Sequence, residues 1–236
     1  MLFLKDIGIV LRERVFKERD ELVTLLTLEH GKRLFMSYGS RLPKSKKAAP
    51  LQLFNTVEFQ ARHSKAGPPV FEQVKLLTSR AFPMLEVGGL PSFYRASAMS
   101  AFVDRLLPEG AVAKEVFHAL SFCLDHIGVN VSFALFQIRI LSDLGYLPDF
   151  AHCSRCHLKL KLKDELCFST DTKGFAHREC CRQKGETGLL LSVDKDLVRV
   201  MSFFQKGSME KSIKVQVSEE LQDEMQLLLE KIEVHS

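Results

Sequence analysis

The chain of 236 residues is long enough for one large domain or two small ones. Its 46% hydrophobic and 26% charged residues are typical of a globular protein, which excludes long disorder. No apolar run is long enough to cross a bilayer, and the N-terminus lacks the pattern of a signal peptide. We therefore expect a soluble cytoplasmic protein with no membrane partner.

The net charge of +4 is unevenly distributed along the chain. Met1–Arg80 carries 15 Lys and Arg against 8 Asp and Glu, whereas the remainder carries 18 against 21. A basic first third predicts that any polyanion binds near the N-terminus. Six cysteines in a cytosolic chain favour metal ligands or free thiols over disulfides.

The first eighty residues are predicted to form short strands with turn signals between them. The strand-like segments are Leu2–Arg14, Glu21–Leu28, Arg33–Tyr38, Leu51–Gln60 and Val70–Leu77. Several short strands of this kind predict a small closed β-barrel. A helix at Asp20–Leu28 stays open as an alternative, because a short apolar run is ambiguous.

A basic loop, Gly39–Lys47, follows the third of these segments. No Asp or Glu occurs from His30 to Val57, whereas six cations do: Lys32, Arg33, Arg41, Lys44, Lys46 and Lys47. A basic loop held on strands can contact phosphates, and the alternative is a merely solvated loop. The nearby aromatic residues Phe35, Tyr38 and Phe54 could stack on bases or belong to the core.

After residue 80 the apolar period becomes helical. The predicted helices are Ser92–Leu107, Val112–Ile127, Val131–Leu144, Val193–Phe204 and an amphipathic segment that begins after Ser218. Asn130 is predicted to cap the third helix, and Cys123 is interpreted as a buried small hydrophobe. The fold class is therefore α+β, with a barrel in residues 1–80 and a helical domain in residues 81–236.

A cysteine-rich segment at about residues 149–188 interrupts the helical pattern. Cys153-x-x-Cys156 is followed, after twenty residues, by His177-x-x-Cys180. Two chelating pairs at this spacing can close a tetrahedral site, and thiolate and imidazole ligands suit structural zinc. Reduced thiols in a loop are the alternative. Cys181 could replace Cys180 as fourth ligand, and Cys167 is a weaker candidate because it lies in the middle of a predicted strand.

A catalytic metal is a further alternative. His177-Arg-Glu179 matches the His-x-Glu element of zinc deaminases, in which Pro-Cys-x-x-Cys follows that element. Here the order is reversed, and Ala151-His152 precedes the first cysteine. Four protein ligands would also leave no open position for a reacting water. We therefore interpret the site as structural.

Three stretches of the first third resemble the N-terminal half of the bacterial recombination mediator family RecO. They are Leu22-Val-Thr-Leu-Leu-Thr-Leu-Glu-His-Gly-Lys32, Gly39-Ser-Arg-Leu-Pro-Lys-Ser45 and Leu51-Gln-Leu-Phe54. The order of strands, helices and a late cysteine segment is similar along nearly the whole chain. Many members of the family have a cysteine at the third ligand position, where this chain has His177, and zinc accepts that exchange.

The resemblance implies an N-terminal oligonucleotide-binding barrel and a helical domain with an embedded zinc segment. It implies a non-enzymatic protein of the nucleoid that binds single- and double-stranded DNA and anneals complementary strands. The implied partners are RecR, with which the recombinase RecA is loaded, and the acidic C-terminal tail of single-strand-binding protein. The implied DNA contacts include Arg33, Arg41, Lys44, Lys46 and Lys47. A zinc-dependent enzyme acting on nucleic acid or nucleotides, and a protein-interaction adaptor, stay open as alternatives.

Overall fold

A computed structural model of the chain describes residues 3–80, 89–161, 164–181 and 188–234. The chain divides into two compact units, Met1–Phe133 and Ala134–Ser236, and each is described by itself. The described residues of the first unit form the barrel and the helices that follow it. The division of the chain into domains at residue 80 stays a prediction.

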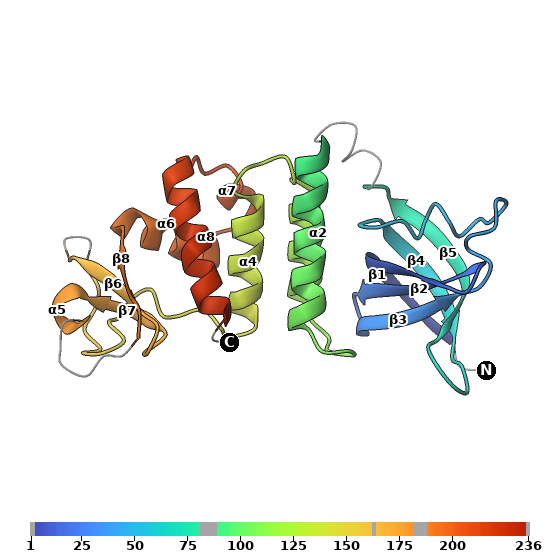
Figure 1. Ribbon diagram of the computed structural model, residues 1–236, viewed down its shortest axis with the longest axis horizontal. Helices are drawn as coiled ribbons and strands as arrows, with labels where there is room; N and C mark the ends of the chain where they lie inside the picture. The colour runs from blue at the N-terminus through green and yellow to red at the C-terminus, as the bar shows by residue number, and fades with distance from the viewer. Residues whose placement is uncertain (1–2, 81–88, 162–163, 182–187, 235–236) are drawn as a thin grey trace. The chain divides into compact units, whose positions relative to one another are not determined.

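The predicted barrel is confirmed. Five strands close in the order β1-β2-β3-β5-β4, which is the arrangement of an oligonucleotide-binding fold (Figure 1). The strands are β1 (Phe3–Phe16), β2 (Asp20–Thr27), β3 (Gly31–Ser37), β4 (Thr56–Arg62) and β5 (Val70–Thr78). The long first strand pairs with β4 through its first half and with β2 through its second half, so it belongs to both sides of the barrel. The ambiguous run Asp20–Leu28 is therefore a strand and not a helix.

Three phenylalanine rings fill the centre of the barrel. Phe35 stacks on Phe71 with ring centroids 4.8 Å apart, and its other neighbour, Phe59, lies edge-on at 4.9 Å. All three side chains are at most 1% exposed. Offset and edge-on aromatic pairs of this kind stabilise a core beyond the area that they bury.

The predicted strand Leu51–Gln60 is wrong in its first half. Residues 48–54 form turns, and β4 begins only at Thr56. Phe54 has a left-handed backbone, with φ of +68°, which an extended strand cannot contain. The amide of Phe54 instead donates to the carbonyl of Val10, and Leu51 packs in the barrel core without belonging to a strand.

The Leu-Thr-x-x-His-Gly stretch forms a joint between the barrel and the helices α2 (Gly89–Leu106) and α3 (Lys114–Asp125). The Thr27 hydroxyl donates to the carbonyl of Gly31 and accepts from the amide of His30. Gly31 has φ of +71°, and a Cβ there would overlap the carbonyl of Ala111 in the connection between the two helices. The conformation and the close approach both require glycine.

Arg80 fastens the end of the barrel to α3. The side chain is 5% exposed, and its guanidinium donates to the carboxylate of Asp125, with the nearer N···O distance 2.7 Å. It also donates to the carbonyl of Phe54 and to the hydroxyls of Thr56 and Ser121. The buried charge is therefore fully partnered, as burial of a guanidinium requires.

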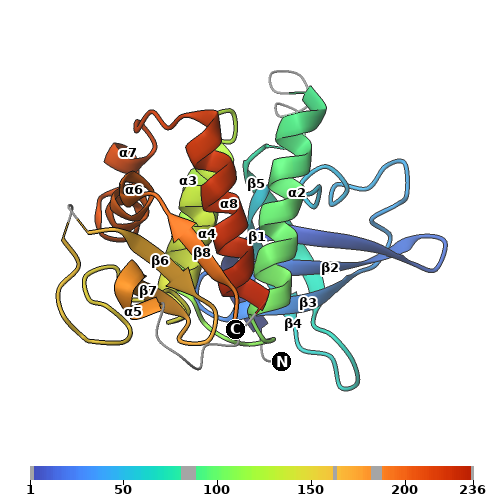
Figure 2. The same cartoon turned by 60° about the vertical axis from the view of Figure 1, so that its left-hand side comes forward.

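The second unit contains helices and a small sheet. Its elements are α4 (Ser132–Asp143, which begins just before the unit), β6 (Leu166–Ser169), β7 (Gly174–His177), α5 (Arg178–Cys181), β8 (Leu190–Val193), α6 (Lys195–Lys206), α7 (Met209–Ser212) and α8 (Glu219–Val234). The sheet has the order β7-β6-β8, and α5 follows directly on β7 (Figure 2). α4 begins at Ser132, so Asn130 lies too early to cap it. Within the described residues, no helix is long and apolar enough to cross a membrane.

Candidate metal centre and nucleic-acid interface

The four predicted metal ligands come together in the second unit. Cys153 and Cys156 lie on a tight turn, where the amide of His157 donates to the carbonyl of Cys153. His177 is the last residue of β7 and Cys180 lies on α5. The amide of Ser154 donates to the carbonyl of Phe175, which ties the turn to β7. Each pair therefore stands on a short, hydrogen-bonded piece of backbone.

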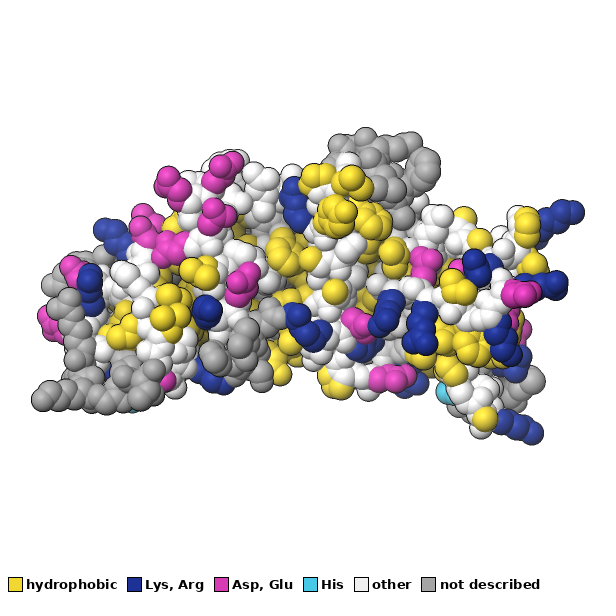
Figure 3. Space-filling model, viewed as in Figure 1, with side chains coloured by type: hydrophobic (Ala, Val, Ile, Leu, Met, Phe, Trp, Pro, Cys, Tyr) yellow, Lys and Arg dark blue, Asp and Glu magenta, His cyan; other side chains and the backbone are white. Residues whose placement is uncertain are grey.

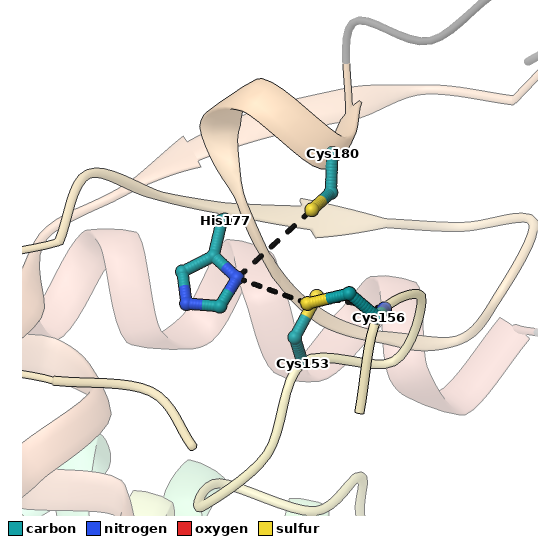
Figure 4. Close-up of side chains that lie close together, drawn as sticks. All are labelled: Cys153, Cys156, His177 and Cys180. Carbon is teal, nitrogen blue, oxygen red and sulfur yellow. Dashed lines mark hydrogen bonds between the residues drawn. The ribbon is translucent and has the colours of Figure 1, made fainter. Parts of the chain in front are cut away.

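The donor atoms of the four side chains lie within 4.8 Å of one another. Figure 4 shows the side chains pointing toward one another, with His177 Nδ1 3.4 Å from Cys156 Sγ and 4.0 Å from Cys180 Sγ. A tetrahedral zinc with Zn–S bonds of about 2.3 Å needs sulfur atoms about 3.8 Å apart. The cluster has both the donor types and the spacing for such an ion, so these four residues could hold a metal.

The other nitrogen of His177 has a carboxylate partner. His177 Nε2 lies 3.2 Å from Asp164 Oδ2. Metal-binding histidines commonly donate their second N–H to a carboxylate, which orients the ring and selects the tautomer. Nδ1 is thereby left to face the cysteines. Asp164 was not predicted from the sequence, and no spacing rule relates it to the ligands.

The pKa values of two thiols move in opposite directions. Burial raises the pKa of Cys153, but hydrogen bonds from the backbone amides of Cys156, Arg155 and His177 outweigh it and lower the pKa to about 6. Burial, the Cys156 thiol and the charge of Cys153 raise the pKa of Cys180 to about 11. One thiolate is therefore favoured before a metal arrives, and further thiolates must be stabilised by the cation itself.

The remaining two cysteines of the segment are not available as alternative ligands. Cys167 on β6 and Cys181 on α5 form a disulfide. The preference for metal ligands or free thiols over disulfides is therefore wrong for this pair, because the pairing of β6 with β7 brings two residues fourteen positions apart together. Cys123 in α3 forms no disulfide, and it is buried as predicted.

The predicted DNA-contacting residues fall into two groups. Arg41, Lys44 and Lys46 are exposed on the basic loop. Lys47 is half-buried, its ammonium donates to the carbonyl of Phe71 at 2.8 Å, and burial lowers its pKa. Arg33 is also half-buried and donates to the carbonyl of His30. The last two side chains therefore support the backbone of the barrel, although their charge stays close to its surface.

A second basic segment, which was missed from the sequence, lies beside the loop. The tip of the β1–β2 hairpin carries exposed Lys17 and Arg19. The amide of Arg41 donates to the carbonyl of Arg19, and the guanidinium of Arg41 donates to the carbonyl of Glu18. In the sequence these cations alternate with acids, so the net charge of the stretch does not reveal them.

The hairpin tip and the basic loop thus form one surface, here called the cationic rim, whose members are Lys17, Arg19, Arg41, Lys44 and Lys46. Lys and Arg side chains gather over the barrel in Figure 3. Two exposed aromatic residues accompany the rim: Tyr38 is 53% and Phe16 is 36% exposed. Phe35 and Phe54 are buried and belong to the core, so they cannot stack on bases. Sequence proximity could not separate Tyr38 from these two residues.

A shallow cavity of about 280 Å³ lies on the outer face of β1, β2 and β3. Its lining is Arg12, Arg14, Leu22, Thr24, Lys32, Arg33, Leu34, Asp104 and Glu109. Lys32 and Arg12 both reach the carboxylate of Asp104, at 3.0 and 3.6 Å. This face is basic, but part of its charge is already used to hold α2.

The second unit has a larger cavity, of about 970 Å³, beside α6. Its apolar lining includes Phe150, Leu160, Leu166, Val198, Phe203 and Val215, and its polar lining includes Lys161, Lys195, Arg199, Lys206, Asp196 and Ser202. Asp196 pairs with Arg199 at 3.1 Å. The cavity is therefore apolar with a cationic border, a composition that suits an apolar anchor carried on an acidic chain.

The fold and the site define a class of two-part α+β proteins. An oligonucleotide-binding barrel of five strands carries a cationic rim, and a helical unit with a Cys₃His centre follows it. Comparison with known proteins specifies the family. The family model "Recombination protein O N terminal" matches residues 1–80, and "Recombination protein O C terminal" matches residues 90–233. The chain belongs to the RecO family, as the resemblance predicted.

Several curated relatives carry the name DNA repair protein RecO. The protein of Desulfitobacterium hafniense (strain DSM 10664 / DCB-2) is 28% identical over 86% of this chain and 74% of its own length. That of Heliobacterium modesticaldum is 30% identical over 78% of this chain and 67% of its own length. That of Caldanaerobacter subterraneus subsp. tengcongensis is 25% identical over the whole of this chain and 94% of its own length.

Proposed function

We propose that this protein is a non-enzymatic mediator of DNA repair and recombination that binds single- and double-stranded DNA and anneals complementary strands. In this proposal it acts in the bacterial cytoplasm and, with RecR, loads RecA onto strands coated with single-strand-binding protein. Family membership supports the repair role. The observation that carries the DNA-binding part is the cationic rim on an oligonucleotide-binding barrel.

The chemistry of the rim suits annealing. Two complementary strands repel each other, and they must slide past each other until their bases are in register. Lys and Arg side chains neutralise phosphates without reading bases, so they lower the repulsion and leave the bases free to pair. Tyr38 and Phe16 offer apolar faces on which a base can stack transiently.

The test is the salt dependence of binding to single-stranded DNA. Each phosphate contact contributes about −0.7 to the slope of log K against log salt. Replacement of Arg41, Lys44 and Lys46 by alanine should lower the affinity and flatten the slope by up to about 2, almost equally for every DNA sequence. Annealing of complementary oligonucleotides, with and without single-strand-binding protein, should slow in parallel.

Two control variants make this test specific. Lys65→Ala with Lys75→Ala removes two exposed cations from the β4–β5 side of the barrel, and it should leave the slope nearly unchanged. Lys47→Ala should lower the stability of the barrel and leave the salt slope nearly unchanged, because the ammonium donates to the carbonyl of Phe71. Wild-type affinity and slope in a folded Arg41, Lys44 and Lys46 triple variant would show that the rim is only solvated.

The metal in this proposal is structural zinc, held by Cys153, Cys156, His177 and Cys180. Soft thiolates and an imidazole favour zinc over hard cations. Four protein ligands fill a tetrahedral site, which disfavours a zinc-dependent enzyme as the alternative. About one zinc per chain in protein purified without chelators is expected, and the Asp164→Ala variant should bind it more weakly.

The cavity beside α6 supports a second part of the proposal, which is binding of the acidic, Phe-ended tail of single-strand-binding protein. The tail's phenyl ring would contact Phe203, which is 41% exposed, and its acids would face Lys195 and Lys206. In fluorescence polarisation at low salt, the tail peptide should bind saturably. Binding should weaken in the Phe203→Ala variant and in the double Lys195→Ala, Lys206→Ala variant.

The matched control for the double variant is Lys211→Ala with Lys214→Ala, which removes the same charge from exposed positions outside the cavity lining. Equal weakening by the two double variants would reduce the interaction to general charge attraction. No saturable binding of the peptide to the wild-type protein would contradict this part of the proposal and leave the DNA-binding part intact.

A further inference from the structure

The disulfide Cys167–Cys181 lies in the same buried cluster as the metal ligands. Cys153, Cys167, Ala176 and Cys181 form this cluster, and Cys180 packs against it. Cys167 and Cys181 are only 4% and 3% exposed. The sulfur of one metal ligand, Cys153, and both sulfurs of the disulfide are therefore packed together.

Each half of the disulfide is directly connected to a metal ligand. Cys181 follows Cys180 on α5, a helix of four residues. Cys167 is paired across the sheet with Ala176, the residue before His177, and its sulfur lies 3.5 Å from the carbonyl of Ala176. The disulfide thus joins β6 to the backbone that carries His177 and Cys180, which are two of the four ligands.

Such a link changes how much of the metal-binding free energy is used to order the ligands. A four-residue helix has no stability of its own, because helix nucleation is costly and propagation needs more residues. Without the disulfide, α5 must be ordered at the expense of metal-binding free energy. With the disulfide, Cys180 stays close to β7 before the metal arrives, so less ordering remains to be done.

We propose that Cys167 and Cys181 are a reversible redox pair that is thermodynamically linked to the metal site. The disulfide preorganises the ligands for zinc, and bound zinc in turn favours the disulfide. The reductant is a low-molecular-weight thiol such as glutathione. Two of its molecules give up two protons and two electrons to the protein disulfide, which becomes two thiols, while the two glutathione sulfurs form a new disulfide. This inference rests on the metal site proposed above and is independent of DNA binding.

Linkage makes the proposal quantitative. If the disulfide raises zinc affinity by some factor, zinc must shift the thiol–disulfide equilibrium toward the disulfide by the same factor. Closing a loop of about this length restricts an unfolded segment by an amount that corresponds to at most about a hundredfold in an equilibrium constant. We therefore expect a factor between about 10 and 100.

The first measurement is zinc affinity by competition with a chromophoric chelator. Oxidised wild-type protein should bind zinc about 10 to 100 times more tightly than reduced wild-type protein. The double variant Cys167→Ala, Cys181→Ala should behave like the reduced protein under both conditions. Cys123→Ala, which removes a buried cysteine of the first unit that is outside the disulfide, should keep the wild-type difference. Thiol counting after denaturation identifies the two forms, since the chain has six cysteines and four are free in the oxidised form.

The second measurement uses only wild-type protein and therefore does not depend on how a variant folds. The fraction of disulfide is determined at equilibrium in glutathione buffers, with and without saturating zinc. Zinc should move the midpoint toward more reducing buffers by the same factor found in the first measurement. Equal zinc affinity of the two redox forms, a zinc-induced shift toward the dithiol, or six reactive thiols under every buffer condition would overturn the proposal. Failure of the DNA-binding tests above would not affect either measurement.

Discussion

The barrel and the metal segment of this chain are both built from short strands, but they are held together by different means. The barrel closes on itself with β1 of 14 residues and buries a core from all five strands. Among the described residues, the sheet beside the metal centre has three strands of four residues each, and the metal segment, residues 149–188, contributes β6 and β7. Its buried cluster contains Cys153, Cys167, Ala176 and Cys181, so three of those four residues are cysteines.

The difference shows how one chain compensates for a small core. A closed barrel satisfies the hydrogen bonds of every strand and buries aromatic side chains at its centre, so apolar burial can hold it. Strands of four residues bury less surface than long strands, so they offset less of the entropy lost on folding. Around the metal centre, Phe168 and Phe175 supply some apolar burial, and the proposed metal and the disulfide add cross-links to it. The following predictions test this division.

Removal of the metal should have the largest effect. Apparent binding energies of structural zinc in small peptides are about 10–16 kcal/mol, so chelation under reducing conditions should unfold residues 149–188 and leave the barrel folded. Hydrogen exchange should show that β6 and β7 lose protection and that β1 keeps its protection. Cys153→Ser should have the same local effect. Loss of barrel protection after chelation would mean that the two regions do not depend on different forces.

Truncation of the aromatic centre should be the corresponding test of the barrel. Phe35 touches both Phe59 and Phe71 and is fully buried, so Phe35→Ala should cost about 3–5 kcal/mol of unfolding free energy. The denaturant midpoint of the barrel reports it, and zinc content should not change. Phe3→Ala is the control, because Phe3 is 48% exposed and its loss should cost little. A loss below about 1 kcal/mol for Phe35→Ala would argue against a barrel held by apolar burial.

Arg80 sharpens the comparison, because its buried side chain holds part of the first unit by hydrogen bonds and not by apolar burial. Arg80→Met keeps the volume but leaves the carbonyl of Phe54 and the hydroxyl of Thr56 without their donor, which should cost about 2–3 kcal/mol. Thermal unfolding of the first unit measures it. Asp125→Asn should cost less than about 1 kcal/mol. The Asp125 side chain is 48% exposed, so water can take the place of its carboxylate as a partner of Arg80. Similar losses in the two variants would mean that the ion pair, and not the buried hydrogen bonds, fastens α3.

Glu13 should have the smallest effect and a defined pH dependence. Partial burial of its carboxyl group, together with the charge of Glu21, raises its pKa from 4.5 to about 7. Between these values the folded state binds more protons than the unfolded state, so this group lowers stability as pH rises from about 4.5 to about 7. Glu13→Gln should therefore stabilise the protein above pH 7 and have little effect near pH 4.

The residue as a whole is exposed, so solvent screening should keep this gain below about 1 kcal/mol. Denaturant unfolding at several pH values measures it, with Glu18→Gln at the exposed hairpin tip as control. An equal gain at pH 4 and pH 8 would attribute the effect to something other than titration of Glu13.

The sequence by itself predicted the features that depend on local pattern. Short apolar runs separated by turn signals predicted the barrel, and helical periodicity predicted α2, α3, α4, α6 and α8. The spacing of the two chelating pairs predicted the cluster, because a two-residue gap brings both side chains of a pair close together on a short piece of backbone. The motifs of the first third also predicted the family.

Only the tertiary structure decided which side chains are free to act. Lys44 and Lys47 look alike in the sequence, but the carbonyl that accepts from Lys47 belongs to Phe71, 24 residues further along the chain. The register of β6 against β7 likewise placed Cys167 within reach of Cys181. Hydrogen bonds and disulfides of this kind depend on distances between segments far apart in the chain. Local periodicity and charge carry no information about those distances, which is why the rim, the disulfide and the carboxylate behind His177 emerged only from the fold.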